Sequence, residues 1–85
     1  MSSKTIFTNG ILNHDGSIRV EESNIQQEIV FIKDREVHLQ NKKGKKYTVD
    51  VHKNLDLTFC EAGDIAFIKF KQGNVYMVGF KKVIV

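Results

Sequence analysis

The chain of 85 residues contains no proline, no tryptophan and only one cysteine, Cys60. A single cysteine excludes an internal disulfide, so no covalent cross-link offsets the limited core of so small a protein. A reactive thiolate needs an electropositive pocket, whereas Cys60 is followed by the acidic Glu61. We therefore interpret Cys60 as a small buried or half-buried thiol. Because proline is absent, every segment can in principle occupy a helix interior or a central strand as far as that residue is concerned.

Long apolar runs are also missing from the sequence. No run approaches the ~18 residues that span a bilayer, and residues 1–13 lack the apolar stretch and the small-residue cleavage site of a secretion signal. We expect a cytoplasmic protein with no membrane partner. The sequence also lacks a Walker loop, a GxGxxG motif and a Ser-His-Asp pattern. We therefore expect a binding protein and not an enzyme, with no cofactor and no small-molecule substrate.

Length and composition indicate one globular domain over residues 1–85. Two cores for separate domains cannot be built from so little chain. Apolar residues make up 41% and charged residues 27%, a mixture that is typical of folded proteins and not of disordered ones. Six Phe and two Tyr can supply much of the core, because each ring buries on the order of 150–250 Å².

Turn-forming residues recur at short, regular spacing, which predicts an all-β fold. The turns centre on residues 13–16, 33–35, 41–45, 61–64 and 71–74, and most of them place Gly beside Asp or Asn. The segments between them are rich in Ile, Val, Phe, Thr and Tyr. The expected strands are residues 5–12, 17–21, 28–33, 36–40, 46–52, 64–70 and 75–82. We expect six or seven short antiparallel strands in a small barrel or rolled sheet.

Side-chain alternation distinguishes the last hairpin from the other strands. Tyr47, Val49 and Val51 alternate with polar residues, as expected for a half-buried strand. Residues 65–70 and 75–80 are apolar on both faces, so this hairpin is expected to lie centrally or to cover an interface. Gly10 indicates a bulge. Gly79 within a strand indicates a bend or a close backbone approach.

Residues 23–27 are the ambiguous segment. Ser23 and Gln26 fit a capping box, which favours one helical turn here. The β-rich residues 29–32 follow at once, so we expect at most that single turn. A longer helix is the alternative, because Ile25, Ile29 and Ile32 have helical spacing.

Charge is distributed unevenly, which is the main indication of a partner. Residues 1–42 carry five Lys or Arg against six Asp or Glu, whereas residues 43–85 carry eight Lys against four acids. Basic groups interleaved with aromatic rings are typical of surfaces that bind single-stranded nucleic acid. The predicted contacts to single-stranded DNA or RNA are Lys42, Lys43, Lys45, Lys46, Tyr47, Lys69, Lys71, Tyr76, Lys81 and Lys82.

Two alternatives to nucleic-acid binding remain. Lysine is the ordinary turn and edge residue of small β-proteins, so the basic half can also be a merely solvated face. The apolar tail Val83, Ile84 and Val85 extends the last strand, and it predicts an edge that pairs with a protein partner or with a second copy of the chain. In that alternative the protein is an inhibitor, adaptor or assembly factor.

The histidines suggest a further, weaker hypothesis. If the strands on either side of residues 41–45 pair with residues 37 and 39 beside residues 49 and 51, His38 falls near Asp50 and His52 on the outer face of the sheet. Two imidazoles and a carboxylate can bind zinc or exchange protons. No fourth ligand is evident, so we interpret the three residues as a water-facing polar row and predict no metal site.

Overall fold

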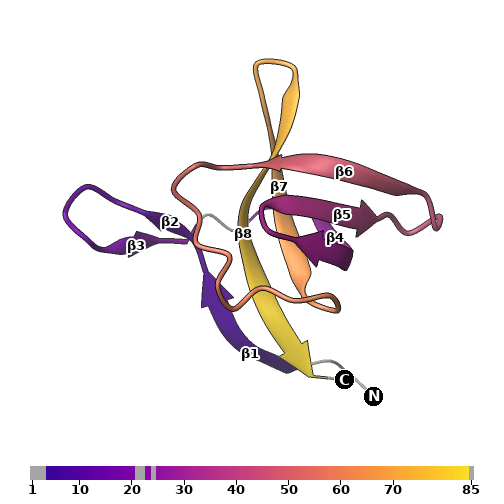
Figure 1. Cartoon of the computed structure of the whole chain (residues 1–85), viewed down its shortest axis with the longest axis horizontal. Helices are drawn as coiled ribbons and strands as arrows, with labels where there is room; N and C mark the ends of the chain where they lie inside the picture. Colours follow the sequence, from indigo (N-terminus) through magenta and orange to yellow (C-terminus); the bar gives the residue numbers. More distant parts are fainter. Residues whose placement is uncertain (1–3, 21–22, 24, 85) are drawn as a thin grey trace.

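The computed structural model describes residues 4–20, 23 and 25–84. These residues form eight strands and no helix (Figure 1). No membrane-spanning helix is therefore found among them. The strands are β1 (Lys4–Asn9), β2 (Ile11–Leu12), β3 (Ile18–Arg19), β4 (Ile25–Lys33), β5 (Glu36–Gln40), β6 (Lys46–Val51), β7 (Ile65–Lys71) and β8 (Asn74–Ile84).

Five of the described strands close into a barrel. Their order is β8-β6-β5-β4-β7, and β7 pairs with β8 to complete the circle. β1 is an extra strand that pairs with the C-terminal part of β8. All pairs in this sheet are antiparallel except β6 and β8, which run parallel through Asp50↔Tyr76 and Val51↔Met77. The all-β barrel predicted from the turn spacing is confirmed, with one parallel pair in place of a wholly antiparallel sheet.

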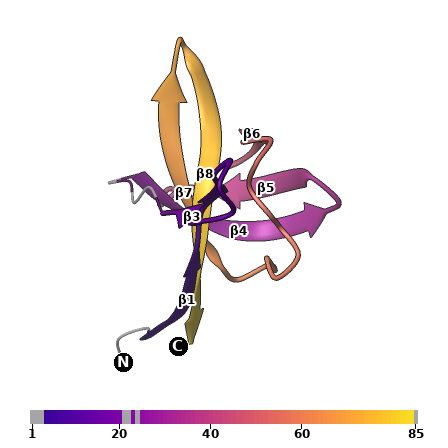
Figure 2. The ribbon, with the colours of Figure 1, turned by 90° about the vertical axis from the view of Figure 1, so that its left-hand side faces the viewer.

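Hairpin turns form at residues that tolerate a positive φ. Lys71 pairs with Asn74 across a two-residue loop, in which Gln72 and Gly73 have φ values of 52° and 80°. Positive φ at both loop positions is the geometry that matches the twist of adjoining strands. The β7–β8 hairpin therefore continues as a tall ribbon beyond the barrel (Figure 2).

β2 and β3 form a separate two-stranded hairpin, which we call the arm (residues 11–19). The arm projects to one side of the barrel (Figure 1). The expected first strand is divided at Gly10 into β1 and β2. A Cβ at Gly10 would collide with the carbonyl oxygen of Arg19, so only glycine lets the two backbones come together here.

Buried side chains form a main core inside the barrel and a smaller outer core. The main core contains Ile29, Val37, Leu39, Val49, Leu55, Cys60, Ala66, Ile68, Met77 and Phe80. The outer core contains Ile11, Phe67 and Val78, with Tyr76 packed against it. β7 and β8 contribute to both cores, which explains why this hairpin is apolar on both faces. The prediction that it lies centrally is confirmed.

The helical turn favoured for residues 23–27 does not form in the described residues. Ile25 to Gln27 already belong to β4 and pair with β7. The Ser23 hydroxyl accepts a hydrogen bond from the Ile25 N–H, as in a cap, but it also donates to the carbonyl of Ile68. Ladder pairing with β7 thus outweighs the local capping preference. Asn24 lies outside the described residues.

Candidate nucleic-acid-binding groove

A groove of about 550 Å³ lies between the arm, the turn after β6 and the β7–β8 hairpin. We call it the basic groove. Figure 1 shows the arm at the left, the hairpin tip at the top and the turn after β6 between them. The described residues that line it are Ile11, Arg19, Val51, His52, Lys53, Lys69, Phe70, Lys71, Gln72, Tyr76 and Val78. Four of these residues are Lys or Arg, and none of them carries a carboxylate.

The floor of the basic groove is the exposed side of the outer core. Ile11 and Val78 are buried, and the half-buried Tyr76 packs against their cluster. Tyr76 is directly opposite Lys69 on the neighbouring strand, so the two side chains lie on the same face of the hairpin. The floor is thus apolar and aromatic, with an ammonium group beside the ring.

Cations come to the groove from three separate segments of the chain. Arg19 is in the arm, Lys53 is in the turn after β6, and Lys69 and Lys71 are on β7. Lys53 and Lys71 are exposed, and neither forms an ion pair within the described part of the chain. Like charges on facing walls focus a positive potential into the space between them.

Arg35 holds the turn that carries Lys53. Its guanidinium donates to the carbonyl oxygens of His52 at 2.8 Å and Leu55 at 3.0 Å. The Leu55 N–H also donates to the His52 carbonyl, and the Asn54 N–H donates to the imidazole Nδ1 of His52. These bonds close residues 52–55 into a defined turn beside the groove.

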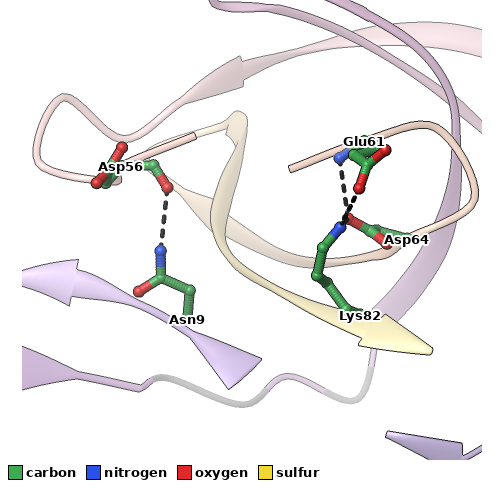
Figure 3. A network of polar contacts seen from close by, with 5 residues as sticks. All are labelled: Asn9, Asp56, Glu61, Asp64 and Lys82. Carbon is green, nitrogen blue, oxygen red and sulfur yellow. Dashed lines mark hydrogen bonds and ion pairs between the residues drawn. The ribbon is translucent and has the colours of Figure 1, made fainter. Parts of the chain in front are cut away.

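The arm and the end of β1 are fastened to this turn and to the residue that follows it. The Leu12 N–H donates to the carbonyl of Asn54, and Ile11 forms a bridge with Leu55. At the end of β1, the Asn9 side chain donates to the Asp56 carbonyl at 3.1 Å (Figure 3). The arm wall and the turn wall of the groove are therefore positioned together.

The structure brings only part of the predicted basic surface together. Lys69, Lys71 and Tyr76 lie in the basic groove. Lys42, Lys43, Lys45 and Lys46 are exposed at the turn between β5 and β6, which we call the lysine turn (residues 41–46). Asn41 shapes that turn by accepting the N–H groups of Lys43 and Lys45 on its side chain.

Acidic side chains occupy the surface between the lysine turn and the groove. The middle of β6 and the β4–β5 turn line another depression of about 670 Å³, and its lining includes Asp34, Glu36 and Asp50. Lys33 and Arg35 partly balance these carboxylates. The lysine turn and the basic groove are thus two basic surfaces separated by one of mixed charge.

Lys81 and Lys82 lie near the far end of β8 from the hairpin tip. The Lys81 ammonium is 6.0 Å from the centre of the Phe67 ring. The Lys82 ammonium is 2.9 Å from carboxylate oxygens of both Glu61 and Asp64 (Figure 3). Burial lowers the pKa of Lys82, but its hydrogen bonds to the two carboxylates raise the pKa by more, so the net shift is upward. The charge of Lys82 is matched inside the protein.

The predicted rings differ in exposure. Phe80 is fully buried in the main core, whereas 67% of Phe70 is exposed at the hairpin. Tyr47 is half-buried and packs against the main core, and desolvation raises the pKa of its phenol. Tyr76 is therefore the predicted stacking ring that shares a groove with cations.

The histidine hypothesis assumed a strand register that does not occur. Val37 pairs with Val49 and Leu39 with Tyr47, which places His38 opposite Thr48. His38 contacts Glu36 and the edge of the Phe31 ring, while His52 lies in the turn beside the groove. In the part of the chain described, no group of three or more His, Cys, Asp or Glu side chains is arranged to hold a metal ion.

Cys60 lies in the main core, as expected from its position. Burial raises the pKa of its thiol to about 12, and the nearby carboxylate of Asp64 adds to the shift. The thiol is therefore neutral at physiological pH and unsuited to nucleophilic chemistry.

The C-terminal edge is occupied by the chain itself. Val83 pairs with Thr5 and Ile84 with Lys4, so the tail extends β8 as expected, and β1 covers it. Val85 lies outside the described residues. Apolar side chains are exposed on and next to the arm, where Leu12 and Ile18 are 47% and 49% exposed and the adjoining Val20 is 42% exposed.

Sequence reasoning missed Arg19, His52 and Lys53 as groove residues. Arg19 and Lys53 are isolated cations in their segments, and they reach the groove only through the docking of the arm and the fold of the 52–55 turn.

Comparison with known proteins gives no match to a family model, to a curated protein or to a solved structure. The chemistry of the groove is consequently the basis on which its ligand is inferred.

Proposed function

We propose that this protein is a non-enzymatic nucleic-acid-binding domain and that the basic groove is its binding site. The observation that supports the proposal most is the combination of four Lys or Arg side chains with the ring of Tyr76 in one groove. Lysine and arginine contact phosphates, and aromatic rings stack on bases. The described lining contributes no carboxylate that would repel a polyanion.

The lysine turn is assigned a smaller role in this proposal. Its four lysines raise the local potential and speed the approach of a polyanion, but the lining of Asp34, Glu36 and Asp50 separates the turn from the groove. A strand held in the groove is not expected to continue along the middle of β6. The two surfaces therefore make separable contributions to binding.

A charge-matched pair of variants tests the location of the site. Lys53→Ala with Lys71→Ala removes two groove charges, and Lys42→Ala with Lys43→Ala removes two from the lysine turn. Anisotropy of a labelled random oligonucleotide of about 12 nucleotides is measured across salt concentrations. The groove variant is expected to bind more weakly and to lose about 1.4 from the salt slope, because each phosphate contact on a single strand contributes about 0.7.

Two outcomes would count against the proposal. A greater loss in the lysine-turn variant would move the site to residues 41–46. No binding of any DNA or RNA by the unaltered protein at about 50 mM salt would contradict nucleic-acid binding altogether, because even non-specific affinity is measurable there.

Association with a protein is the second candidate function, and the exposed arm favours it. Leu12 and Ile18 present apolar surface on the face of the arm opposite to Arg19, and the exposed Val20 directly follows the arm. A partner that covers this face would explain its composition. Light scattering that shows a monomer at all concentrations, together with failure to capture a partner, would contradict this candidate.

A further inference from the structure

We propose that the floor of the basic groove is a binding site for an unpaired nucleobase, with Tyr76 as its stacking ring. This inference rests on the proposed function and deepens it, because it names the form of nucleic acid that the site takes. The ligand is then a single strand whose bases are free to turn inward. A duplex and a base-free polyanion both lack that feature.

The position of Tyr76 supplies the first argument. The ring is half-buried, because one side packs on the outer core of Ile11, Phe67 and Val78 and the remainder lines the groove. A ring held in this way is already ordered before a ligand arrives. Stacking a base on it therefore costs little side-chain entropy.

The second argument is that the walls of the groove are cationic whereas its floor is apolar and aromatic. Arg19 and Lys53 stand on one side of the groove and Lys69 and Lys71 on the other, above a floor of Ile11, Tyr76 and Val78. A single strand matches both parts, because its phosphates reach the cationic walls while a base covers the apolar floor. In a duplex the bases are stacked internally, and phosphate contacts carry the affinity.

Phe70 lies beside the groove, but its side chain is on the other face of the hairpin. It pairs with Val75, so alternation directs it away from Lys69, Lys71 and Tyr76. Phe70 is among the lining residues of the groove, and its side chain remains largely exposed. We assign Tyr76, and not Phe70, to the base on the floor.

The sequence itself provides a spectroscopic test, because it contains two tyrosines and no tryptophan. In Tyr47→Phe, the only tyrosine is Tyr76, and stacking of a base on it should quench the tyrosine fluorescence when single-stranded oligonucleotide is added. In Tyr76→Phe, the only tyrosine is Tyr47 on the main core. That matched variant should show no quenching when the same oligonucleotide is added.

Affinity measurements provide the second readout. Tyr76→Leu should weaken binding of a single strand by about 5- to 150-fold, since a stacked base contributes about 1–3 kcal/mol. Tyr47→Leu is the control at a half-buried tyrosine away from the groove. Binding of a duplex of the same length, and of inorganic polyphosphate, should change little in Tyr76→Leu, because neither places a base on the floor.

The outcomes separate this inference from the proposed function. Equal affinity for single strand, duplex and polyphosphate, with no quenching in Tyr47→Phe, would overturn the base site while leaving a polyanion-binding groove. Absence of binding to all three probes would overturn both. If Tyr76→Leu fails to fold, the fluorescence comparison of the two phenylalanine variants still decides the question.

Discussion

At the scale of single residues, Lys82 shows how surroundings alter the role of a charge. Sequence position places it among the lysines of the basic half, as a phosphate contact. In the fold its ammonium lies between Glu61 and Asp64, and Asp64 is only 6% exposed. The Asp64 carboxylate also accepts the Glu61 N–H, so the three groups tie the loop before β7 to the end of β8 (Figure 3).

This network predicts a loss of stability at high pH. Pairing raises the pKa of Lys82 above 10.5 in the folded protein, so its stabilisation is complete below pH 10.5 and is lost as pH rises through the shifted pKa. Urea midpoints measured between about pH 9 and pH 12 should fall more steeply above pH 10.5 for the unaltered protein than for Lys82→Met. Parallel curves for the two proteins would show that the ion pairs contribute nothing to stability.

At the scale of elements, Gly79 allows β8 to pack closely against both β1 and the outer core. A Cβ at this position would lie 2.8 Å from the carbonyl oxygen of Asn9 and 3.2 Å from the ring of Phe67. Both groups are fixed, one in β1 and the other in the outer core. The close backbone approach that the sequence indicated at Gly79 is confirmed, and its cause is the packing of β1 beside β8.

Gly79→Ala should therefore destabilise the fold. Overpacking of a filled site costs about 1–3 kcal/mol, which corresponds to a fall in Tm of roughly 5–20 °C for a chain of this size. Thermal unfolding followed by circular dichroism measures the change. Gly73→Asn is the control, because asparagine tolerates the positive φ of an exposed turn. An unchanged Tm in Gly79→Ala would mean that β1 does not pack closely here.

Arg35 acts at the same scale, by shaping the turn that carries Lys53. Because Arg35 lies outside the groove lining, Arg35→Met should weaken oligonucleotide binding only by displacing that turn. The double variant with Lys53→Ala should then bind no more weakly than Lys53→Ala alone, within about twofold. Additive losses would indicate that Arg35 contacts the nucleic acid itself. Similar urea midpoints for the variants and the unaltered protein would exclude general unfolding as the cause of weaker binding.

At the scale of the whole molecule, the two ends of the chain meet in one pair of strands. β1 pairs with the last residues of β8, and β7 closes the barrel against the same strand. Most of this architecture depends on contacts between distant parts of the sequence. Such non-local topologies fold in milliseconds to seconds, because loop-closure entropy is lost before the contacts form.

Refolding kinetics should reflect both the topology and the composition. We expect stopped-flow refolding from urea to occur in milliseconds to seconds, without the slow phase of about 10–100 s that proline isomerisation produces. The chain has no proline from which such a phase can arise. A phase of tens of seconds that is independent of protein concentration would contradict this expectation.

Local sequence patterns determined the strands and turns of this protein, because alternation and turn residues act over a few neighbouring positions. β5 matches its predicted range, and the other long strands differ mainly at their ends. The preferred helical turn near Ser23 was wrong because pairing of β4 with β7 is a long-range effect that outweighs a local cap. The distinctive character of the β7–β8 hairpin was apparent in the sequence, because both of its faces are apolar.

The site, by contrast, depended on how distant segments dock. Lys69, Lys71 and Tyr76 were identifiable from the sequence, because they share one hairpin. Arg19 and Lys53 join them only after Gly10 lets the arm approach and Arg35 closes the 52–55 turn. Barrel closure also distributes the lysines of the basic half of the chain among the basic groove, the lysine turn and the paired Lys82. Lysines from the same half of the sequence reach different faces of the molecule, because the strands between them lead there.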